Sequence, residues 1–112
     1  MTRTIRQSDY FWADLLKQVE WYRLQAGPEV AGRYIDAVEA TLRRLAAVPG
    51  LGRPRFKNWP ELAGIRSFRV EQPFHRHLIF YRFDEESLLA ERVVHGARDL
   101  PCRLLRSPHD DE

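Results

Sequence analysis

Hydrophobic residues recur at helical spacing in the segment that follows Ser8 and Asp9. The apolar positions stand at i, i+3, i+4 and i+7 and continue one turn further: Trp12, Leu15, Leu16, Val19 and Tyr22. This period predicts an amphipathic helix. Ser8 or Asp9 is suited to cap its N-terminus, because either side chain accepts a hydrogen bond from a free backbone N–H.

A second helix is predicted directly after the first. Its apolar positions are spaced by four, three, four and three residues: Ala31, Ile35, Val38, Leu42 and Leu45. Gly27-Pro28 separates the two helices, since glycine favours a helix end and proline is tolerated at the first helical position. Pro49-Gly50 closes the second helix. Helices joined by so short a connection are expected to pack antiparallel.

The hydrophobic period changes to two in the second half of the chain. Residues 50–64 contain several Gly and Pro breakers and are interpreted as loop. Arg66, Phe68 and Val70 then alternate with Ser67 and Arg69, as in a strand with two different faces. Residues 78–83 are apolar on both faces except at Arg82, which is typical of a central strand.

A hairpin completes this half of the chain. Residues 84–87 form the predicted turn, and residues 88–95 the last strand. Residues 2–7 suggest an edge strand with Ile5 as its apolar anchor, and residues 97–105 a short terminal turn or helix. The predicted order β-α-α-β-β-β is an α+β fold, with the helical hairpin on one face of a small antiparallel sheet. The other face is expected to stay exposed or to form a shallow groove.

Length and composition fit one globular domain. We assign residues 1–105 of the 112 to it and residues 106–112 to a frayed acidic tail. The single cysteine, Cys102, excludes an internal disulfide and a cysteine-based zinc site. No apolar stretch reaches the roughly 20 residues needed to span a bilayer, and no signal-peptide core follows the N-terminus. We therefore expect a cytoplasmic protein with no membrane partner.

Positive charge is concentrated in the middle of the chain. Residues 53–82 contain seven basic residues and two acidic ones, Glu61 and Glu71. The local net charge is about +5, compared with +2 for the whole chain. The basic residues are Arg53, Arg55, Lys57, Arg66, Arg69, Arg76 and Arg82. Such a block is typical of a surface for nucleic acid or an acidic protein, and equally of an ordinary solvated surface.

Motifs of common enzymes are absent from the sequence. It contains no Gly-rich phosphate loop, no His-Glu-x-x-His and no Gly-x-Ser-x-Gly. His75 and His77 have the spacing of two metal ligands, but no third ligand is evident, so we expect no metal and no cofactor.

Tyr81, His95 and Arg98 are better candidates for chemistry. Together they offer a stacking ring or acid, a proton carrier and a phosphate clamp, a set able to cleave RNA through its 2′-hydroxyl. The structural alternative places Tyr81 in the core, pairs Arg98 with Asp99, and has His95 donate to a backbone carbonyl.

Several segments in order give the chain a family resemblance. They are residues 34–39 (Tyr-Ile-Asp-Ala-Val-Glu), 49–55 (Pro-Gly-Leu-Gly-Arg-Pro-Arg), 65–70, 78–82 and 95–100 (His-Gly-Ala-Arg-Asp-Leu). With these pieces the chain resembles the RelE/ParE superfamily of toxins from bacterial type II toxin–antitoxin pairs over residues 8–105, and the ParE branch most closely. The resemblance implies the helical hairpin on an antiparallel sheet.

The resemblance also implies a protein partner. Each such toxin is neutralised by a neighbouring antitoxin, here expected to be ParD-like with a ribbon-helix-helix domain, which lays a helix and an extended segment around the toxin. Operator DNA would be reached only through that antitoxin. The residues that we assign to antitoxin binding are Trp12, Leu16, Tyr34, Arg53 and Arg55.

Two activities diverge within the superfamily. ParE-like members are reported as a class to poison DNA gyrase, and for that reading the target-binding residues are Arg66, Arg69, Arg82 and Arg98. RelE-like members cut messenger RNA on the ribosome, and for that alternative the catalytic set is Arg66, Arg82, His95 and Arg98. The chain has only two lysines, Lys17 and Lys57, which departs from the RelE pattern. An inactive homologue that acts only within the antitoxin complex is the third interpretation.

Overall fold

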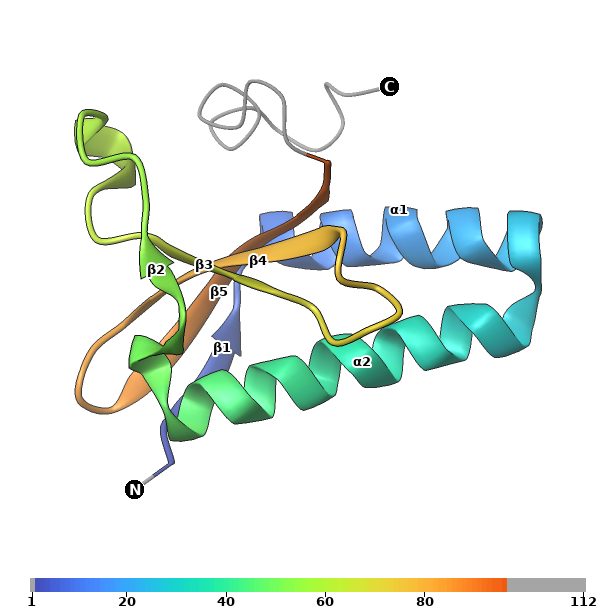
Figure 1. Ribbon diagram of the computed structural model, residues 1–112, viewed down its shortest axis with the longest axis horizontal. Coiled ribbons are helices and arrows are strands. Elements are labelled where there is room, and N and C mark those ends of the chain that lie inside the picture. The colour runs from blue at the N-terminus through green and yellow to red at the C-terminus, as the bar shows by residue number, and fades with distance from the viewer. Residues whose placement is uncertain (1, 97–112) are drawn as a thin grey trace.

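The computed structural model describes residues 2–96 as a helical hairpin against one five-stranded sheet (Figure 1). Predictions for residues 97–112, including Arg98, Cys102 and the acidic tail, lie outside the described residues. The helices and strands are β1 (Thr4–Gln7), α1 (Asp9–Ala26), α2 (Pro28–Ala47), β2 (Arg53–Pro54), β3 (Arg66–Arg69), β4 (His77–Phe83) and β5 (Ser87–His95). Two short 3-10 helices, η1 (Pro49–Leu51) and η2 (Pro60–Leu62), flank β2.

The sheet has the strand order β1-β5-β4-β3-β2. The α+β class and the central position of β4 are therefore confirmed. The sheet is mixed, however, because β1 pairs with β5 in parallel while the other pairs are antiparallel. The predicted antiparallel pairing holds for β2 to β5, and the parallel pairing of β1 is an addition, since no local pattern shows that the first strand lies beside the last.

The helix boundaries follow the predicted signals. The Ser8 side chain accepts a hydrogen bond from the Phe11 backbone N–H at 3.0 Å and caps α1. Gly27 has a φ of +97°, which favours glycine, and Pro28 starts α2. Both helices pack on one sheet face around the main core, which includes Phe11, Leu15, Tyr34, Val38, Leu42, Leu45, Ile79, Tyr81, Leu88 and Val93. In the described part of the chain, no helix is long and apolar enough to cross a membrane.

The opposite face of the sheet is partly covered. The segment from Arg55 to Ile65, which lies mostly within the predicted loop 50–64, folds over this face and forms a second apolar cluster. Its buried members are Leu62, Ile65, Phe80 and Val94, and Phe56 and Leu78 pack against them. This face was expected to stay exposed or to form a shallow groove, and part of it is covered because the apolar residues scattered in the segment are used for packing.

A close contact fixes the start of β2 to the sheet. The Tyr81 hydroxyl donates to the Pro49 carbonyl at 2.6 Å and accepts from the Gly52 N–H at 2.9 Å. A Cβ at Gly52 would lie only 2.4 Å from that hydroxyl oxygen, so the position requires glycine. The structural alternative for Tyr81, a core residue, is confirmed, and burial raises the pKa of its phenol.

Candidate functional site

The outer face of α1 exposes five large apolar side chains. The helix buries Phe11 and Leu15 against the sheet, yet Trp12 is 46% exposed and Leu16 is 62% exposed. The full set is Tyr10, Trp12, Leu16, Trp21 and Leu24. Large apolar side chains are normally buried, and a group of exposed ones on a surface marks an interaction site. We call these five residues the α1 apolar face.

Tyr34 does not belong to that face. It is fully buried between the rings of Tyr22, Phe74 and His77, with ring centroids 4.7–5.3 Å apart. Its assignment as a surface contact for an antitoxin was wrong, because its side of α2 faces the sheet. Burial raises the pKa of its phenol well above the usual value, and no hydrogen-bond partner for the hydroxyl is found among the described residues.

β2, which contains Arg53 and directly precedes Arg55, is the edge strand of the sheet that lies away from α1 (Figure 1). Arg53 is exposed, whereas Arg55 is half-buried and donates to the Ser67 hydroxyl at 2.9 Å. Burial and the neighbouring charge of Arg53 lower the pKa of Arg55. With Arg69, they line an open cavity of about 580 Å³ at this edge. The cavity gives the basic block a concave surface, at a distance from the α1 apolar face.

Arg66 and Arg82 point to opposite faces of the sheet. Arg66 is paired with Tyr81 across β3 and β4, and opposed residues share a face. Arg82 follows Tyr81 in β4 and therefore points to the other face. Arg66 and Arg82 therefore do not share a face of the sheet.

Arg82 is held by contacts within the protein. Its guanidinium forms an ion pair with Glu91 at 2.5 Å and donates to the backbone carbonyls of Ala63 and Glu61. These bonds attach the segment between β2 and β3 to the sheet. Arg82 therefore has an evident structural role, whereas Arg69 is an exposed residue of β3.

His95 is the last residue of β5 and lies opposite His77 of β4, with the two ring centroids 4.8 Å apart. His77 is buried and its Nε2 lies 2.9 Å from the Tyr22 hydroxyl. Burial, with a smaller effect of the nearby His95, lowers the pKa of His77 to about 4. In residues 2–96, no group of three or more His, Cys, Asp or Glu side chains is placed to hold a metal ion.

The predicted ribonuclease residues do not converge on one point. His77, the partner of His95, and Arg82 are five positions apart in β4, which is about 17 Å along a strand. Arg66 and Arg82 face opposite sides, and Arg98 lies outside the described residues. The arrangement therefore offers no shared position for a phosphate and a proton carrier.

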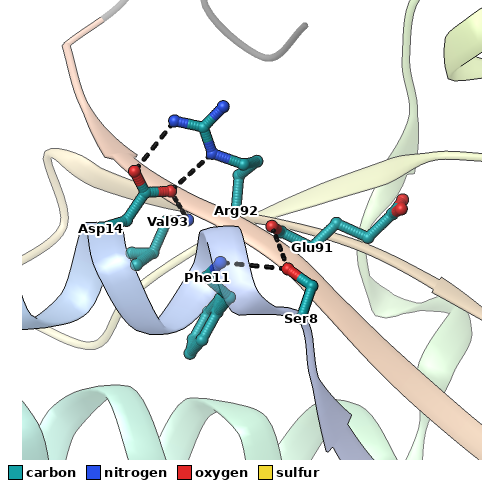
Figure 2. A network of polar contacts seen from close by, with 6 residues as sticks. All are labelled: Ser8, Phe11, Asp14, Glu91, Arg92 and Val93. Atoms are coloured by element: carbon teal, nitrogen blue, oxygen red, sulfur yellow. Dashed lines mark hydrogen bonds and ion pairs between the residues drawn. The ribbon is translucent and has the colours of Figure 1, made fainter. Parts of the chain in front are cut away.

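A buried ion pair that the sequence did not reveal fixes α1 to the sheet. Asp14 accepts two hydrogen bonds from Arg92, at 2.7 and 2.9 Å, and a third from the Val93 N–H at 3.1 Å (Figure 2). Close by, the Ser8 hydroxyl donates to the Glu91 carbonyl while it caps α1. These contacts bond the Glu91 carbonyl and the Val93 N–H, which lie beyond the part of β5 that pairs with β1. They fix the buried side of α1 to the sheet, so the α1 apolar face points outward.

Comparison with known families decides the classification. Residues 5–100 match the family model described as the ParE toxin of the type II toxin–antitoxin system parDE. The chain belongs to the ParE toxin family. The resemblance inferred from the sequence is thereby confirmed, including the ParE branch.

Two relatives agree with this placement. Toxin ParE3 of Caulobacter vibrioides is 32% identical over 78 residues, which cover 70% of this chain and 71% of the relative. A chain of the solved chromosomal ParDE TA system from P. aeruginosa superposes with a TM-score of 0.68, at 19% identity, over 86% of this chain and 98% of that chain. The identity with Toxin ParE3 supports the family, and the likeness to the solved structure supports the fold alone.

Proposed function

We propose that this ParE-family toxin is neutralised by a cognate antitoxin that covers the α1 apolar face, and that the free toxin inhibits DNA gyrase. The observation that carries the first half is the exposure of Tyr10, Trp12, Leu16, Trp21 and Leu24 on one helix. Their exposure is costly in water, and a partner helix in the complex would remove it.

The second contact of the antitoxin is proposed at the sheet edge. Arg53 and Arg55 border a cavity there, and the surrounding charge favours an acidic extended segment. An antitoxin helix bound on α1, followed by such an extended segment, would reach both the α1 apolar face and the cavity at the sheet edge. We expect this antitoxin to be a ribbon-helix-helix protein encoded beside the toxin, through which the complex reaches operator DNA.

Substitution on α1 tests the antitoxin proposal. Leu16→Glu places a charge in the α1 apolar face without loss of core packing, since Leu16 is 62% exposed. Affinity for the protein encoded by the adjacent reading frame should fall at least tenfold in a titration. Val48→Glu, at an exposed apolar position beyond the C-terminus of α2, is the matched control and should bind as the wild type does. Equal affinity of both variants would reject the α1 apolar face as the interface.

The gyrase proposal rests on membership of the ParE branch, whose members are reported as a class to poison this enzyme. We propose that the toxin stabilises a gyrase–DNA intermediate. For the contact surface, Arg66 and Arg69 remain candidates, while the ion pair of Arg82 with Glu91 favours a structural role there.

Supercoiling of relaxed plasmid by purified gyrase and ATP tests the target. Antitoxin-free toxin should inhibit supercoiling and accumulate cleaved DNA, and Arg69→Ala should weaken this effect. Full gyrase activity at a large excess of folded toxin would reject the proposal for that enzyme. Ribosome-dependent RNA cleavage, with His95→Ala as control, would then test the alternative, although its residues do not converge. Growth unaffected by the chain alone would favour an inactive homologue.

A further inference from the structure

A second cavity lies where the chain leaves β2 and returns to β3. Its volume is about 480 Å³, within the range of small-ligand sites. The lining includes Arg55, Lys57, Gly64, Ile65, Arg66 and Phe83. Phe83, at the end of β4, is 38% exposed and gives the cavity an aromatic wall. We call this the arch cavity, since residues 54–66 curve around it.

Three cations and no carboxylate line the arch cavity. Two neighbouring segments carry acidic residues, Glu61 within residues 54–66 and Asp84 in the turn after Phe83, and neither residue lines the cavity. The Asp84 carboxylate accepts hydrogen bonds from the Glu86 and Ser87 N–H groups, so it is directed into its own turn. A concave group of like charges that its own lining does not neutralise is suited to an anionic ligand.

The Arg66 guanidinium is already oriented at the cavity wall. Its Nη1 donates to the Gly52 carbonyl at 2.6 Å, and its Cζ lies 5.6 Å from the centroid of the Phe83 ring. The Arg3 guanidinium also lies near this ring, at 5.3 Å. The hydrogen bond to Gly52 is the only one that the Arg66 guanidinium makes with described residues, which leaves further N–H groups for a ligand.

From this arrangement, we propose that the arch cavity binds single-stranded nucleic acid. Arg66 and Lys57 contact backbone phosphates, and Phe83 with its neighbouring guanidinium stacks on a base. The combination of cations with an exposed aromatic ring favours this ligand over an acidic peptide, because a carboxylate needs no stacking surface. The site shares Arg66 with the proposed target surface, but it is a separate activity that needs no gyrase.

The test measures binding of a fluorescent oligothymidylate of about twelve nucleotides to the full chain by anisotropy, without gyrase. The affinity should fall with salt with a slope of about −1.4 for the two phosphate contacts of Arg66 and Lys57, at about −0.7 per contact for single strands. Phe83→Leu keeps an apolar side chain but removes the stacking ring, and should weaken binding about tenfold. Lys57→Ala should reduce the salt slope by about 0.7.

Arg33→Ala is the matched control, since Arg33 is an exposed cation on α2 outside the cavity. It should leave both affinity and slope close to those of the wild type. Equal binding by wild type, Phe83→Leu and Lys57→Ala would overturn the proposal. Tighter binding of polyglutamate than of the oligothymidylate would also overturn it, in favour of an acidic peptide. Because gyrase is absent, this proposal and the gyrase proposal can fail independently.

Discussion

Removal of the Asp14 carboxylate should be among the most damaging single changes in this protein. The Asp14 and Arg92 side chains are only 8% and 3% exposed, and Asp14 also accepts from the Val93 N–H. Asp14→Ala leaves a buried guanidinium without its carboxylate and a strand N–H without its acceptor. Breaking such a pair costs about 3–5 kcal/mol. A domain of this size has a total stability of about 5–15 kcal/mol.

Urea unfolding followed by tryptophan fluorescence measures this loss. With a slope of about 2 kcal/mol per M, the midpoint should fall by about 2 M. Asp14→Asn retains one oxygen acceptor and should lose less than Asp14→Ala.

Asp36→Ala is the control, because Asp36 is an exposed acidic residue in the middle of α2. It should unfold near the wild-type midpoint. If Asp14→Ala and Asp36→Ala shift the midpoint equally, the ion pair with Arg92 does not hold α1, and the account of how its apolar face is presented is wrong.

Three further predictions concern stability. Gly52→Ala should cost about 1–3 kcal/mol, because its Cβ would overlap the Tyr81 hydroxyl, and an unchanged urea midpoint would contradict this packing. Wild-type stability should fall by about 2 kcal/mol between pH 7.5 and pH 5, because His77 has a pKa near 6.5 in the unfolded chain and about 4 in the folded protein. In urea titrations at both pH values, His77→Gln should not show this loss of stability. Identical pH profiles for the variant and the wild type would refute the role of His77. Ser8→Ala should lower stability by about 0.5–2 kcal/mol through loss of the α1 cap, whereas an unchanged thermal midpoint would exclude that role.

The candidate surfaces were only partly predictable from sequence. Trp12 and Leu16 are exposed as expected, but Tyr34 has the same apolar character and is buried. Helical spacing places residues on faces, and it does not say which of two apolar faces meets the sheet. The positive charge of residues 53–82 was visible in the sequence. The position of Phe83 at the arch cavity was not, because it depends on where β4 ends relative to the segment after β2.

The sequence alone determined the elements of this protein. Both helices, their Ser8 and Gly27-Pro28 boundaries and the last three strands follow from short-range periods and from the backbone preferences of single residues. The family also followed from the order of local segments.

The tertiary structure decided which elements meet. Parallel pairing of β1 with β5, the opposite faces of Arg66 and Arg82, and the Asp14–Arg92 pair join residues far apart in the chain. Asp14 and Arg92 are 78 positions apart. Strand register and the burial of charge are set by the packing of the whole core, so no local pattern encodes them.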